Sequence, residues 1–71
     1  MMTYKVKFNI YQNGNIIKTD FMNCDVRGKD LDTMTLRKRL TNNIKTWQSA
    51  YNKDRLTGKA VFEVESFERI N

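Results

Sequence analysis

The chain has 71 residues, of which 39% are hydrophobic and 30% charged, and its net charge at pH 7 is +5. These values predict one small globular domain, spanning residues 1–71, rather than a disordered chain. The sequence holds one cysteine and no histidine, which excludes an internal disulfide and an imidazole acid or base. No apolar run approaches the roughly 18 residues that a transmembrane helix needs, so we expect a cytoplasmic protein in a reducing compartment.

Residues 4–22 alternate between apolar and polar side chains, with one interruption at residues 12–15. Within the interruption, Asn13 and Gly14 form a dipeptide that readily accepts the positive φ angles of a type I′ turn. The stretch therefore predicts a β-hairpin with a two-residue turn. Its core face is predicted to consist of Tyr4, Val6, Phe8, Ile10, Ile17, Thr19 and Phe21.

The predicted register of this hairpin pairs residues whose chemistry agrees on both faces. Val6 falls opposite Phe21 on the core face, and Lys7 falls opposite Asp20 on the other face. A slip by one residue would set Phe21 against the lysines, which argues for the register as predicted.

Residues 23–32 are polar and predict a loop. A phosphate-binding loop at Gly28 and Lys29 is rejected, because the required glycine and hydroxyl residues are missing around them. A calcium loop at Asp30 and Asp32 is rejected as well, because its later ligands are missing. We interpret Asp32 as the N-cap of the following helix, with Asp30 favoured by the positive helix end. The sequence therefore predicts no metal or cofactor site.

A helix is predicted from about Thr33 to Tyr51, because apolar residues recur there at steps of three and four. Such a helix is about 28 Å long and matches the length of the hairpin strands. We expect its stripe to cover the hairpin, with Trp47 in the core rather than on a surface that stacks on bases. The stripe consists of Leu36, Leu40, Ile44, Trp47 and Tyr51, with Met34 at one end.

The last predicted strand starts near Lys59, with Ala60, Phe62 and Val64 on its core face. Phe67 then lies on the opposite, exposed face unless a β-bulge near Ser66 turns it inward. The sequence leaves both alternatives open.

The third strand can pair with either strand of the hairpin. We favour the first strand, because Glu63 and Glu65 would then face Lys5 and Lys7 across an antiparallel pair. The predicted fold is a single α+β domain of ββαβ order, with a three-stranded sheet in the order 2-1-3 and one helix across one face.

The basic side chains concentrate in the middle of the chain, where residues 27–59 hold nine basic and three acidic residues. Such an excess attracts acidic partners, and Lys and Arg on a helix suit phosphate oxygens. The first hypothesis is a non-catalytic binding or regulatory module with an acidic partner such as nucleic acid. A solvated helix face is the competing interpretation, because residues 37–39 spread over about 200° of a helix. The proposed contacts are Arg37, Lys38, Arg39, Lys45, Lys53 and Arg55.

The second hypothesis is a protein-interaction or self-associating module that uses the outer sheet face or the unpaired strand edges. Small proteins of this composition are common in phages and mobile elements, where they bind other proteins. An ordinary solvated face competes with it, because single exposed hydrophobic residues are normal. The candidate interface residues are Tyr11, Ile16, Met22, Val61 and Phe67. Catalysis is not expected, because Cys24 has no histidine to activate it and the chain is short for a closed pocket.

Overall fold

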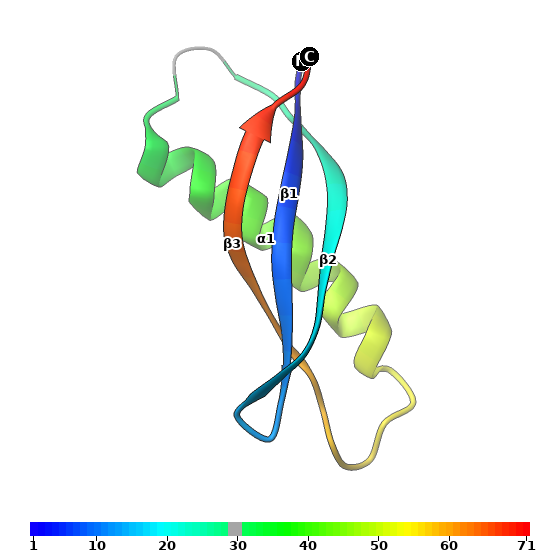
Figure 1. Ribbon diagram of the computed structural model, residues 1–71. Helices are drawn as coiled ribbons and strands as arrows, with labels where there is room; N and C mark the ends of the chain where they lie inside the picture. The colour runs from blue at the N-terminus through cyan, green and yellow to red at the C-terminus, as the bar shows by residue number, and fades with distance from the viewer. Residues whose placement is uncertain (29–30) are drawn as a thin grey trace.

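The computed structural model describes residues 1–28 and 31–71. Four elements follow one another along the chain: β1 (Met2–Gln12), β2 (Asn15–Val26), α1 (Thr33–Asn52) and β3 (Val61–Arg69). The strands form one antiparallel sheet in the order β2-β1-β3, and α1 crosses one face of it (Figure 1). The predicted α+β fold, the ββαβ order and the place of the third strand beside the first are confirmed.

The turn of the hairpin has the predicted geometry. Asn13 has φ 54° and Gly14 has φ 80°, so both residues occupy the left-handed region that a type I′ turn requires. Asparagine and glycine are the residues that adopt this region at least cost, which explains why the chain reverses here.

The register changes after the second residue pair beyond the turn. Tyr11 pairs with Ile16 as predicted, but Ile10 lies opposite Lys18. Ile17 is therefore an extra residue with no partner on β1, which is a β-bulge. From this point on, every pairing predicted between β1 and β2 is wrong by one residue.

The bulge exchanges the two faces of β2. Phe21, predicted in the core opposite Val6, instead lies opposite Lys7 on the outer face. Its side chain is 53% exposed, and the ammonium of Lys5 lies 4.9 Å from the centre of its ring. The predicted contact between Lys7 and Asp20 is likewise wrong, because Asp20 now lies on the face that α1 covers.

The physical reason for the exchange is the length of β2, which continues to Val26 through the first half of the predicted loop. The bulge places Met22, Cys24 and Val26 on the helix-covered face, where Cys24 and Val26 are buried. Burial of these side chains outweighs that of Phe21. The suggested role of Asp30 at the helix start lies outside the described residues.

A second bulge, at Glu65, decides the position of Phe67. It turns Phe67 toward the helix-covered face, where its ring packs edge-on against Tyr4 with 6.1 Å between ring centres. On the outer face, Glu65 forms the expected cross-strand ion pair with Lys7 at 3.1 Å. Of the two alternatives for Phe67, the structure has the inward one.

The helix begins where the sequence predicts and ends one residue later than predicted. Asp32 is the N-cap, and its carboxylate accepts a hydrogen bond from the amide of Thr35 at 2.8 Å. The buried residues of α1 are Leu36, Leu40 and Ile44, which form the second half of the core.

The ends of the apolar stripe were wrongly predicted as core. Met34 is 83% exposed, Trp47 is 57% exposed and Tyr51 is 40% exposed. Figure 1 shows the cause at the second end: the hairpin tip swings away from the last turns of α1. Bulges strengthen the right-handed twist of a sheet, so β2 and the end of α1 diverge and leave side chains uncovered between them.

Two separate substitutions, one of a buried and one of an exposed apolar residue, test the observed register through their effects on the free energy of unfolding. We expect Leu40→Ala to lower the free energy of unfolding by about 3 kcal/mol, because it opens a cavity in the core. Phe21→Ala should lower it by less than about 1 kcal/mol, because that ring lies on the outer face. Urea unfolding of both variants measures the difference, and equal losses would contradict the observed register.

The N-cap makes stability depend on pH. Hydrogen bonds from Thr35 hold the pKa of Asp32 below its ordinary value of 3.8. The carboxylate therefore stabilises the fold above that value and loses its effect as pH falls through the lower, folded-state pKa. Thermal melting at a series of acidic pH values should show a smaller loss for Asp32→Asn, which keeps a capping oxygen but does not titrate. If Asp32→Asn lost as much thermal stability as the original chain when the pH is lowered, the role of the Asp32 carboxylate would be contradicted.

Candidate functional site

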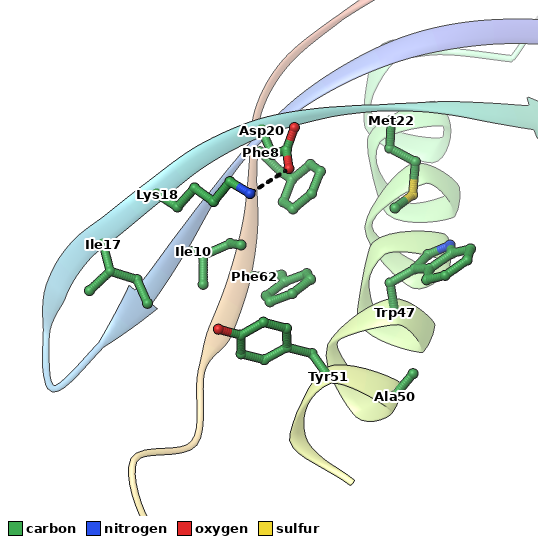
Figure 2. A pocket seen from close by; sticks show the side chains of 10 residues that line it. All are labelled: Phe8, Ile10, Ile17, Lys18, Asp20, Met22, Trp47, Ala50, Tyr51 and Phe62. Carbon is green, nitrogen blue, oxygen red and sulfur yellow. Dashed lines mark ion pairs between the residues drawn. The ribbon is translucent and has the colours of Figure 1, made fainter. Parts of the chain in front are cut away.

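A groove of about 590 Å³ opens between the first half of β2 and the last turns of α1 (Figure 2). We call it the β2–α1 groove. Its volume falls within the range of about 300–1,000 Å³ that is typical of ligand sites. The groove is lined by Phe8, Ile10, Ile17, Lys18, Asp20, Met22, Trp47, Ala50, Tyr51 and Phe62.

Four of the ten residues that line the groove are aromatic. Phe8 and Phe62 are buried and stack on each other with 5.3 Å between ring centres. Tyr51 packs against Phe62 at 5.5 Å, and the guanidinium of Arg55 lies 4.5 Å from the centre of the Tyr51 ring. Trp47 stands on the same wall with more than half of its surface open to solvent. The arrangement suits flat or branched apolar groups of a ligand. The guanidinium of Arg55 adds a positive charge beside Tyr51.

The charged groups of the groove neutralise each other. The ammonium of Lys18 lies 3.3 Å from the carboxylate of Asp20, and Figure 2 shows this ion pair at the β2 side of the groove. The amide of Phe21 also donates to Asp20 at 2.8 Å. These hydrogen bonds, first from Phe21 and then from Lys18, lower the pKa of Asp20 below its ordinary value. The pair is thus an ionised pair with both side chains open to solvent.

The β3 edge of the sheet is closed by three polar side chains of α1. Asn52 donates to the carbonyl of Ala60 and accepts from its amide, both at 2.8 Å. Gln48 accepts from the amide of Phe62 at 2.8 Å. Arg37 donates to the carbonyls of residues 64 and 65 at 3.1 and 3.4 Å. Backbone groups that would otherwise accept another strand are therefore occupied.

The β2 edge is open by comparison. Within residues 1–28 and 31–71, no side chain of another element bonds to the backbone of β2. The amide of Phe21 donates to the neighbouring carboxylate of Asp20 at 2.8 Å, which indicates that it points away from β1. Because backbone groups alternate in direction along a strand, those of Thr19 and Asn23 point outward too. The twelve-residue strand thus presents outward backbone groups beside the groove, among which the amide of Phe21 is bonded to its own neighbour Asp20.

The basic residues predicted as nucleic-acid contacts are not gathered on one surface. Arg37 is bound to β3, with its guanidinium 5.5 Å from the ring of Phe67. Arg39 lies toward the opposite edge, where it donates to the carbonyl of Arg27 at 2.8 Å. Lys38 between them is exposed. The other three lie further along, where Lys45 donates to Gln48, Lys53 is the helix C-cap and Arg55 stacks on Tyr51.

The residues predicted as a protein interface separate into two groups. Tyr11 lies opposite Ile16 on one side and Val61 on the other, so these three are neighbours at the turn end of the sheet. Met22, which was placed on the outer face, and Phe67, whose face was left open, both belong to the helix-covered side. For Met22 this corrects the prediction, and the cause is the bulge in β2.

The groove was missed from the sequence because its wall residues, Trp47 and Tyr51, were predicted as core. One signal was present: Ile16 and Ile17 are consecutive apolar residues, which breaks the period of two and is typical of a bulged strand. The buried thiol of Cys24 stays outside the groove, and burial, with a smaller effect of Asp25, raises its pKa.

Comparisons with known proteins find no family model, no curated protein and no solved structure that matches this chain. Among the described residues, no helix is both long and apolar enough to span a membrane.

The closure of the β3 edge predicts a specific loss of stability. Asn52→Ala removes both partners of the backbone of Ala60, which is buried, so the free energy of unfolding should fall by about 2 kcal/mol. Asn43→Ala, at an exposed position of the same helix, is the matched control and should change it by less than about 0.5 kcal/mol. Similar values for both variants in urea unfolding would contradict the closure.

Proposed function

We propose that this protein is a non-catalytic protein-interaction module that binds an extended segment of a partner along the free edge of β2. One observation supports the proposal above all others, namely the contrast between the two sheet edges. Side chains of α1 occupy the backbone of β3, whereas the β2 edge is open and borders an apolar groove. Such an edge supplies hydrogen bonds to an added strand, and the groove supplies specificity.

The geometry of strand addition defines what the partner segment offers. Side chains of an added strand point alternately to the two faces of the sheet. Those on the helix side would reach the groove between Met22 and Trp47, over the ring of Phe62. Apolar residues at every second position of the segment fit this wall, and an acidic residue at one end fits Arg55.

We place the binding site at β2 rather than on the basic helix surface because of how the arginines are used. Arg37 and Arg39 each donate to backbone carbonyls, at opposite edges of the sheet. A phosphate backbone would have to compete with these hydrogen bonds. The net charge of +5 then acts at long range, by attracting acidic partners, rather than through one built contact surface.

The absence of catalysis is part of the proposal. The chain has no histidine, its thiol is buried, and the charged groups of the groove are an ion pair with each other. A cytoplasmic setting, which keeps Cys24 reduced, is proposed on the same grounds.

The proposal is tested with a displayed library of random peptides, selected against the protein immobilised at low density. Trp47 is the single tryptophan of the chain and lines the groove, so its emission should shift to shorter wavelength when a selected peptide binds. Asn23→Pro removes an outward amide and should weaken binding at least about tenfold. Asn23→Ala keeps the amide and should leave the affinity unchanged.

Thermal melting accompanies the binding measurements, because proline at an outward edge position leaves the ladder with β1 intact. The proposal is wrong if no peptide is selected, or if the selected peptides bind Asn23→Pro as tightly as the original chain.

A further inference from the structure

We infer that the strand added to β2 is the β2 strand of a second copy of this chain, in an antiparallel pair centred on Thr19. The inference rests on the proposed function and names its partner. Two identical strands that pair in this way are related by a two-fold axis, and each presents the same edge to the other.

The chemistry of residues 18–20 is self-complementary about Thr19. A base and an acid flank the threonine, in the order Lys18, Thr19 and Asp20. In an antiparallel pair centred on Thr19, Lys18 of each copy lies opposite Asp20 of the other. The bulge places Ile17 on the helix-covered face and leaves Ile16 on the outer face, so neither shares a face with Phe21 or Met22 of the other copy, respectively, and the pairing is confined to residues 18–20. The pairing of Lys18 with Asp20 is favourable and, by the two-fold symmetry, occurs twice.

The backbone of β2 permits this register. The amide of Phe21 donates to the neighbouring carboxylate of Asp20, which indicates that it points away from β1. Because backbone groups alternate in direction along a strand, those of Thr19 point outward too, so Thr19 can exchange both hydrogen bonds with its counterpart. A pair centred on Asp20 would set two carboxylates against each other. A pair centred on Phe21 would leave Lys18 opposite Cys24, without a charged partner. Side-chain chemistry therefore selects the Thr19-centred register among the possible ones.

The half-exposed apolar residues of β2 fit a second copy as well. Ile16, Ile17 and Phe21 are 54%, 49% and 53% exposed, and all three lie next to the paired stretch. The strand itself carries one lysine and two aspartates, so the positive charge of the chain does not oppose the contact locally. The bulge at Ile17 keeps the ladder short. The dissociation constant is therefore expected on the order of 10 μM.

Charge exchange provides the test, with sedimentation equilibrium of the full chain at concentrations that bracket this value. Lys18→Asp would place aspartates opposite each other in both halves of the dimer, and Asp20→Lys would do the same with lysines. Each variant alone should dimerise at least about tenfold more weakly than the original chain. An equimolar mixture of the two should form a heterodimer, because the introduced aspartate then lies opposite the introduced lysine, and the unchanged Lys18 lies opposite the unchanged Asp20. The double variant Lys18→Asp, Asp20→Lys should again form a homodimer.

Two controls separate this register from effects of charge or folding. Lys53→Asp and Asp54→Lys change the net charge equally but lie after α1, so they should leave dimerisation unchanged. The ion pair between Lys18 and Asp20 is exposed, so melting temperatures of the variants at low concentration should remain close to that of the original chain.

The inference is overturned if the original chain is a monomer at all concentrations, or if the mixture of single variants fails to restore the dimer. If the chain is a monomer but binds selected peptides, and Asn23→Pro abolishes that binding, then the second copy is refuted as the partner and the proposed function is retained. A monomer that binds no peptide refutes both. Binding of nucleic acid in place of self-association, measured on duplex DNA over a salt series, would also overturn it.

Discussion

The extra residue at Ile17 is the constraint on which the rest of this structure depends. It reverses which residues of β2 face the helix, and so brings Cys24 and Val26 into the core while Phe21 moves to the outer face. Because side chains alternate along a strand, one inserted residue changes the environment of every side chain that follows. The same bulge strengthens the twist that separates the hairpin tip from α1.

This separation explains why a chain of modest size has a groove at all. The core residues Leu36, Leu40 and Ile44 cover the sheet where the helix and strands lie close together. Further along α1, the sheet turns away, so Trp47 is left 57% exposed and Tyr51, although its ring still packs against Phe62, 40% exposed. The groove is thus a consequence of geometry between two regular elements, rather than of a loop shaped for a ligand.

The polar side chains of α1 give the domain its asymmetry. Gln48 and Asn52, four residues apart on the helix, satisfy the backbone at the start of β3, and Arg37 satisfies it further on. A small sheet with two free edges is prone to unselective association. Closing one edge leaves a single direction in which the sheet can grow, which is the side of β2. This is the physical basis for proposing a specific interaction there.

The sequence by itself determined the order of the elements, the turn at Asn13 and Gly14, the helix start at Asp32 and the place of the third strand. These features depend on local conformational preference, on periodicity and on charge pairing, all of which act between residues that the sequence identifies directly. Only the tertiary structure decided the register of β2, the inward position of Phe67 and the exposure of Trp47. Each of these depends on a bulge, whose position is selected by the total burial of side chains from two strands and a helix. A short stretch of sequence cannot predict that position, because the buried side chains come from distant parts of the chain.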